Sequence, residues 1–252
     1  MERDLDYVSM FDDRGKIDSY DTVVVGSGYG GSVAACRLSM AGIKVCLFEK
    51  GRKWEGPDFP TDSLKILSAA RIESKNLGVS FGLKDALFQV RIQDDSLAAM
   101  ACGLGGGSLV NCGVMVSTPV RARRNSKWPK EWEKDWEVCE ASASAMLRSQ
   151  SIPVEFSNAK VMKQIAYNEI EESCQSSFKL SINFKPEEAS SNETGSQQMC
   201  SCLACGNCLS GCPYNAKNST DKNYLVSAVQ VYIFLFKVIL FYLKYSLFLF
   251  LQ

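Results

Sequence analysis

Three glycines near the start of the chain, Gly26, Gly28 and Gly31, have the spacing G-x-G-x-x-G. In this spacing the first glycine permits a tight turn, the second lets a pyrophosphate lie against the backbone, and the third lets a helix pack closely on a strand. Glu49 stands twenty-one residues after Gly28, where a carboxylate can accept hydrogen bonds from ribose hydroxyls and would repel a 2′-phosphate. These residues therefore predict a dinucleotide site and disfavour NADP.

A strand, a helix and a second strand must hold these residues in place. The β-branched run at 23–25 is typical of a buried parallel strand, and residues 32–40 indicate a helix that ends at Gly42. The N-terminus of such a helix presents unpaired N–H groups and a partial positive charge to phosphates. Residues 43–48 then predict a second strand that leads into Glu49. A structural turn in another kind of α/β domain is the alternative, but the flanking strand, helix and acid together favour the dinucleotide site.

A second glycine cluster has four glycines within five residues, Gly103 and 105–107. Such a backbone is free to turn its N–H groups toward an anion, and the side chains of Ser108 and Asn111 can add hydrogen bonds. Taken alone, the cluster is also typical of a flexible linker. The apolar residues that follow, up to Val116, favour a packed position instead.

Together, the two glycine segments resemble the glucose-methanol-choline (GMC) oxidoreductases, a flavoprotein family that includes cholesterol oxidase. The matching stretches are DTVVVGSGYGGSVAACRLSMAGIKVCLFEKGRKW and ACGLGGGSLVNCGVMV, and the resemblance is expected to cover about residues 20–227. It implies FAD as the cofactor, with the ADP half on the first stretch and the pyrophosphate and flavin along the second. The FAD contacts that it implies by position are Gly26, Ser27, Gly28, Gly31, Glu49, Gly103, Gly106, Gly107, Asn111 and Gly113.

The resemblance also implies an activity, namely oxidation of the CH–OH group of a sterol or a long-chain alcohol. In that reaction a base takes the hydroxyl proton while hydride passes to the flavin. The family places this base, a histidine, in a C-terminal segment, and the present sequence contains no histidine. We therefore name no catalytic residue and expect the chain to lack the catalytic C-terminal part. The alternatives are a flavin-binding truncated or membrane-tethered fragment without turnover and a flavin/iron–sulfur electron-transfer protein.

The cysteine run Cys202, Cys205, Cys208 and Cys212, followed by Pro213, has the spacing C-x2-C-x2-C-x3-C-P. Four thiolates so spaced are able to hold an iron–sulfur cluster or a zinc ion. However, the fourth cysteine of that pattern normally serves a second cluster, and the chain has no second run. The continuation GCPYNAKNSTDKNYL resembles a loop beside the flavin in the cholesterol-oxidase-like branch of the family. We therefore expect a structural loop with no obligate metal.

The last stretch, Val231–Leu251, is strongly apolar but contains Lys237 and Lys244. We rank an abnormal or alternatively spliced end first, a membrane segment second and a buried helix third, because two lysines on one face are costly inside a bilayer. Residues 1–19 are polar with no apolar core, which indicates no secretory signal and predicts an intracellular protein. With 28 basic and 28 acidic residues, no overall field favours nucleic acid, so the expected partner is a small-molecule alcohol, with membrane contact only through the apolar end.

The predicted fold class is α/β, a Rossmann-like FAD-binding domain with a parallel sheet and flanking helices, joined to part of an inserted substrate-side domain. Changes in composition, together with what the resemblance implies for each segment, divide the chain into a leader (1–18), the FAD-binding domain (19–117), a partial substrate-side or cap region (118–199), a Cys-rich loop beside the flavin (200–227) and an apolar tail (228–252).

Overall fold

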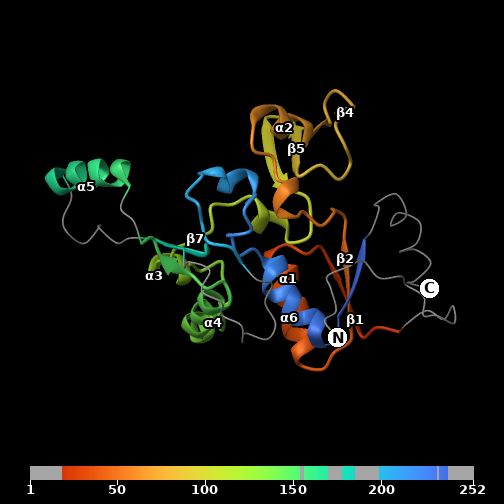
Figure 1. Ribbon diagram of the computed structural model, residues 1–252. Coiled ribbons are helices and arrows are strands. Elements are labelled where there is room, and N and C mark those ends of the chain that lie inside the picture. Colours follow the sequence, from red (N-terminus) through yellow and green to blue (C-terminus); the bar gives the residue numbers. More distant parts are fainter. Residues whose placement is uncertain (1–18, 154–155, 170–177, 185–198, 232, 238–252) are drawn as a thin grey trace.

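The computed structural model describes residues 19–153, 156–169, 178–184, 199–231 and 233–237 (Figure 1). Its first unit is the predicted strand–helix–strand: β1 (Thr22–Val25), α1 (Tyr29–Met40) and β2 (Val45–Glu49). The two strands pair in parallel, with Val23 opposite Cys46. The helix begins three residues earlier than predicted, because Gly28 takes the N-cap position inside the glycine motif.

A third parallel strand comes from the far end of the chain. β10 (Ile233–Lys237) pairs with β2 along its whole length, so the sheet has the order β1-β2-β10. The preceding helix α6 (Tyr224–Val231) lies beside α1 (Figure 1), and the two helices share one core with the sheet. Seven of the side chains in this core have at most 1% of their surface exposed: Ala35, Cys36, Val45, Leu47, Leu104, Leu225 and Ala228. The mixed α/β architecture with a parallel sheet is therefore confirmed.

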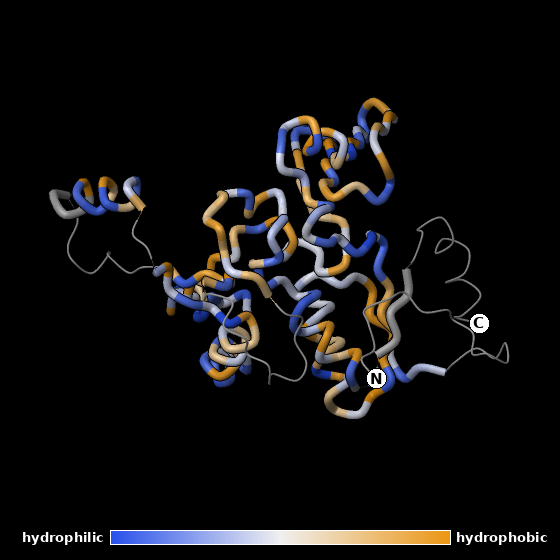
Figure 2. Tube along the Cα trace, viewed as in Figure 1, coloured by the Kyte–Doolittle hydropathy of each residue, from blue (hydrophilic) through white to orange (hydrophobic). Residues whose placement is uncertain are grey.

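β1 differs from the prediction in its burial. Figure 2 shows that hydrophobic residues follow β1 and β2. Nevertheless, Val23 and Val25 are 53% and 69% exposed. Among the described residues β1 is an edge strand that pairs only with β2, and these two side chains point away from α1. The β-branched run thus predicted the strand correctly but not its environment.

The apolar end of the chain also differs from its prediction. Residues 228–237, placed in the apolar tail by composition, continue α6 and then form β10 within the parallel sheet. Residues 233–237 are therefore a strand rather than the buried helix of the third alternative. Residues 238–252 lie outside the described part of the chain. Within that part, none of the helices has the length and apolar character needed to cross a bilayer.

A second sheet leads the chain from the first unit to the second glycine cluster. After the short helix α2 (Ser63–Ser68) come β3 (Ala70–Ser74), β4 (Val79–Phe81), β5 (Phe88–Gln93) and β6 (Ser96–Ala101), in the order β4-β3-β5-β6. β6 ends directly before Cys102, whose N–H donates to the carbonyl of Leu87 at 2.8 Å. A small core of Trp54, Phe59, Leu87 and Leu109 joins this sheet to the second glycine cluster.

A third, small sheet has two strands in the region assigned to the substrate side and one strand, β7, just before the predicted start of that region. Its strands are β7 (Val114–Met115), β8 (Gln150–Ser151) and β9 (Lys179–Leu180), in the antiparallel order β7-β9-β8. The helices between these strands are α3 (Val120–Arg123), α4 (Trp132–Met146) and α5 (Ser157–Glu169). A β-bridge between Ile182 and Lys217 connects this sheet to the segment that follows the Cys-rich run.

Candidate cofactor site

The two glycine segments lie against each other at the start of α1. Gly26 has a φ of +89°, and its N–H donates to the carbonyl of Phe48 at 2.7 Å. A Cβ on Gly31 would lie 1.8 Å from the oxygen of Gly26, and one on Gly106 would lie 2.7 Å from the Cα of Gly28. Neither position has room for a side chain. The structure therefore brings the two segments together, as the resemblance implied.

Ser27 is fully buried at this junction and joins the two segments through its hydroxyl. Its Oγ donates to Oε2 of Glu49 at 2.5 Å and accepts the N–H of Gly105 at 2.9 Å. The N–H of Ser27 donates to the same Oε2 at 2.9 Å, while the N–H of Gly51 donates to Oε1 at 2.7 Å. Glu49, only 6% exposed, thus has a structural role in addition to the ribose contact expected for it.

The first turn of α1 leaves bare backbone facing open space. Its N-cap, Gly28, has no side chain to cap the helix, and no acidic residue stands in the first turn. A Cβ on Gly28, Gly30 or Gly107 would have no atom within 4 Å. Because the first N–H groups of a helix have no partner within the helix and carry partial positive charge, this bare surface fits a pyrophosphate.

The second glycine segment is held by groups that the sequence did not reveal. Ser108 is 2% exposed, and its hydroxyl bonds the carbonyl of Gly105 at 2.7 Å and the hydroxyl of Thr220 at 3.1 Å. The N–H of Thr220 also donates to Ser108 Oγ at 3.1 Å. The expectation that Ser108 would bond an anion is therefore wrong, because its hydroxyl faces the protein interior. Gly103 is likewise buried, with Trp54 where a Cβ would lie.

Asn111 and Gly113 connect the second segment to its neighbours on either side. The amide of Asn111 donates to the hydroxyl of Tyr29, and its Oδ1 accepts the N–H of Gly113 at 3.1 Å. Burial raises the pKa of Tyr29, which this hydrogen bond opposes. The carbonyl of Gly113 accepts the N–H of Ser181 at 2.7 Å. Gly113 is thus bonded to the residue that directly follows β9.

Lys217 is a buried cation that sequence reasoning missed. Its Nζ donates to three backbone carbonyls, those of Leu109 at 2.6 Å, Asn111 at 2.8 Å and Cys208 at 2.8 Å. Burial lowers the pKa of Lys217 to about 8, against the opposing effect of the thiols of Cys208, Cys212 and Cys112. The lysine thereby joins the Cys-rich run to the second glycine segment. No local signal marks it, since its partners lie up to 108 residues away.

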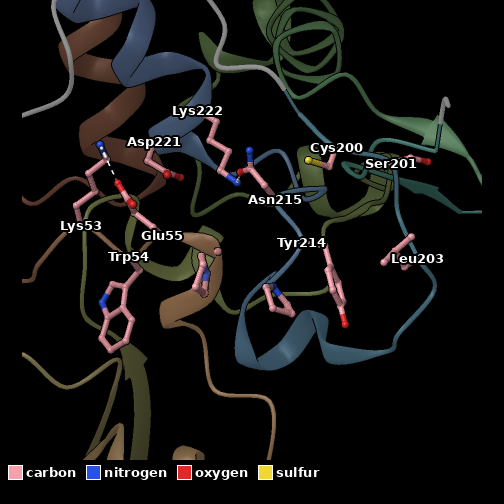
Figure 3. A pocket seen from close by; sticks show the side chains of 13 residues that line it. Lys53, Trp54, Glu55, Cys200, Ser201, Leu203, Tyr214, Asn215, Asp221 and Lys222 are labelled. Atoms are coloured by element: carbon pink, nitrogen blue, oxygen red, sulfur yellow. Dashed lines mark hydrogen bonds and ion pairs between the residues drawn. The ribbon is translucent and has the colours of Figure 1, made fainter. Parts of the chain in front are cut away.

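A cavity of about 750 Å³ opens between the loop after β2 and residues 200–222 (Figure 3). Lys53 and Glu55 form an ion pair of 3.5 Å on one wall, and Lys222 donates to the side chain of Asn215 on another. Asp221 also lines the cavity and is 6% exposed. Burial raises its pKa, which Lys222 and a hydrogen bond from Ser219 oppose. This cavity is mixed in charge and adjoins the second glycine segment at Gly105.

The cysteine run lines a second, smaller cavity. Cys202, Cys205, Cys208 and Cys212 all contribute to its wall, and its volume is about 270 Å³. In the described part of the chain, no three or more Cys, Asp or Glu side chains come together in a group suited to a metal ion. The absence of an obligate metal stays a prediction.

Comparison with known proteins places the chain among oxidoreductases. It is 27% identical over 221 residues to a cholesterol oxidase of Acinetobacter baumannii, covering 83% of this chain and 38% of that protein. It is 31% identical over 210 residues to a long-chain-alcohol oxidase of Arabidopsis thaliana, covering 83% and 25% respectively. A cholesterol oxidase of Mycobacterium tuberculosis is 26% identical, with 82% and 36% covered. The chain thus spans less than two fifths of the length of these relatives.

A family model described as GMC oxidoreductase matches residues 20–236. The expected end of the resemblance near Ser227 is therefore wrong, because the match continues through α6 and almost to the end of β10. Sequence reasoning missed this part of the fold because residues 233–237 lie in a uniformly apolar stretch without turn signals. The strand–helix–strand, the two joined glycine segments and the family match agree: the chain belongs to the GMC oxidoreductase family.

Proposed function

We propose that the chain binds FAD across its two glycine segments and serves an oxidoreductase that acts on the CH–OH group of a sterol or a long-chain alcohol. The observation that carries this proposal is the junction at Ser27, whose hydroxyl holds Gly105 and Glu49 together beside the bare backbone of Gly28 and Gly107. The names of the relatives, cholesterol oxidase and long-chain-alcohol oxidase, support the substrate class.

Each part of the site has a distinct role in this proposal. The N–H groups in the first turn of α1 bind the pyrophosphate, and Glu49 accepts from the ribose. The backbone at Gly106 and Gly107, with the side chain of Asn111, lies along the remainder of the cofactor. When bound, FAD supplies the acceptor for the hydride that leaves the carbinol carbon. The residues of this chain bind and orient the cofactor. The sequence contains no histidine, and we assign proton abstraction to none of its residues.

The second glycine segment favours FAD over NAD. A nicotinamide dinucleotide needs only the first glycine turn and its acid. Here the backbone of Gly105 is bonded to Ser27, and Gly106 stands against Gly28. This close approach leaves a longer bare surface than the first turn alone provides, which suits the larger cofactor.

The variant Gly28→Val tests the proposal without unfolding the protein. Gly28 has a φ of −63°, which any residue adopts, and a Cβ there would meet no atom within 4 Å. We expect the variant to keep the far-ultraviolet circular dichroism of the wild type and to lose FAD, because the valine occupies the place of the pyrophosphate. Isothermal titration calorimetry with FAD and with NAD measures the affinity for each cofactor. Binding of NAD with no binding of FAD by the wild type would contradict the proposal, as would unchanged FAD affinity in the variant.

A further inference from the structure

The smaller cavity lies between the Cys-rich run and the third sheet. One wall comes from every second residue of one segment, namely Leu180, Ile182 and Phe184. The opposite wall is the cysteine run itself, with Leu203 at its rim. Leu203 is 65% exposed and also faces the larger cavity (Figure 3). The lining is therefore almost wholly hydrocarbon and sulfur.

The four cysteines act here as apolar wall residues. All are free, and a free thiol behaves as a small hydrophobic group with only weak hydrogen-bonding capacity. Burial raises the pKa of Cys208, so its thiol stays neutral at physiological pH. The backbone supports this wall with two glycines at positive φ, Gly206 at 77° and Gly211 at 102°. A place in an apolar wall thus gives these cysteines a physical role that requires no metal.

Lys217 is the one charged residue in the described lining, and its ammonium is fully engaged. An ammonium has three donors. The carbonyls of Leu109, Asn111 and Cys208 accept one bond each. The cavity therefore offers a ligand no free cationic donor, and it recognises hydrocarbon. Through these same bonds, its inner wall is continuous with the second glycine segment.

We propose that this cavity binds the unbranched alkyl chain of a long-chain alcohol, and that it excludes the fused rings of a sterol. The volume of about 270 Å³ lies below the range of about 300–1,000 Å³ that is usual for sites of drug-sized ligands. A flexible chain enters such a space end-on, whereas a rigid four-ring nucleus does not. This inference rests on the proposed function, since it chooses between the two substrate classes named there.

Thiol protection tests the proposal on the full 252-residue chain and needs neither FAD nor turnover. The rates at which iodoacetamide alkylates Cys208 and Cys212 are measured by mass spectrometry at increasing concentrations of 1-decanol. We expect both rates to fall, by about tenfold when decanol reaches ten times its apparent Kd, since protection scales as 1 + [L]/Kd. Cys139 is exposed on α4 and lies outside the lining, so its rate serves as an internal control and should not change.

A matched pair of variants assigns the protection to the cavity. Leu203→Asp places a charge at the rim and should abolish protection by decanol. Leu83→Asp changes a leucine of similar exposure, 67%, that lines neither described cavity, and should leave protection intact. Equal protection by cholesterol, equal slowing at Cys139, or full protection in the Leu203 variant would each overturn the proposal. Failure of FAD binding in the wild type would refute the proposed function while leaving this measurement unchanged.

Discussion

Removing the hydroxyl of Ser27 should destabilise the protein more than any other single-atom deletion at the glycine junction. The Ser27→Ala change takes away the bond to Oε2 of Glu49 at 2.5 Å and the acceptor for the N–H of Gly105 at 2.9 Å. Both lost partners are buried: Glu49 is only 6% exposed, and Gly105 is buried as well. Water therefore cannot replace the hydroxyl without opening the contact between the segments.

The magnitude follows from the kinds of bond involved. A hydrogen bond to a charged group contributes about 1.5–3 kcal/mol, and a buried donor left without a partner costs about 1–3 kcal/mol. Because these contributions overlap, we expect a loss of about 3 kcal/mol in the free energy of unfolding. For a chain of this size, such a loss lowers the melting temperature by roughly 6–12 °C. FAD affinity should fall as well, since the second segment loses its tie to the first.

Urea unfolding followed by circular dichroism measures this loss, with Ser39→Ala as the matched control. Ser39, in α1, is also fully buried, but its hydroxyl has no hydrogen-bond partner within the described structure. Its removal should therefore be neutral or stabilising. Equal losses in the two variants would refute the reasoning, because the effect would then come from the cavity alone and not from the hydrogen bonds.

Two further predictions concern packing and pH. Gly31→Ala should destabilise the protein by about 1–3 kcal/mol and weaken FAD binding, because the added Cβ would lie 1.8 Å from the carbonyl oxygen of Gly26. Gly30→Ala, with open space around its Cβ, should be neutral or stabilising. The midpoints of urea unfolding distinguish the two variants. The pKa of Lys217 is about 8 in the folded protein, against an ordinary pKa of 10.5. Between these two pH values the unfolded chain binds more protons than the folded protein. The free energy of unfolding should therefore rise with pH over this range, by about 3 kcal/mol in total. Below pH 8 both states are protonated and the cost of burying the charge is fully present. Lys217→Met should remove this rise, and an identical pH profile in variant and wild type would contradict the prediction.

The strand–helix–strand could be predicted because its signals are local. The glycine spacing, the β-branched run and the acid at the end of the second strand all lie within thirty residues, and β1, α1 and β2 follow them closely. β10 could not be predicted in the same way. Its residues form part of a uniformly apolar stretch without turn signals, and only pairing with β2, almost two hundred residues earlier, defines the strand.

The candidate site shows the same division. The adjacency of Gly28 and Gly106 followed from family resemblance alone, since no local pattern relates two turns so far apart. Thr220 and Lys217 contact the second segment from 112 and 108 residues away, and neither residue type is unusual in a loop. Ser108 was placed correctly along the chain but given the wrong partner, because its orientation depends on the fold around Thr220.

The carboxylate of Glu49 has a role in the fold as well as in the proposed cofactor site. A carboxylate has about four lone-pair directions, two on each oxygen. Oε2 accepts from both the N–H and the hydroxyl of Ser27, and Oε1 accepts from Gly51. Within the described part of the chain one direction on Oε1 remains, so under the proposed function a single hydrogen bond to this side chain is available for the ribose. The acid therefore sets the geometry of the two glycine segments first, and the proposed contact with the nucleotide uses the one position that this task leaves open.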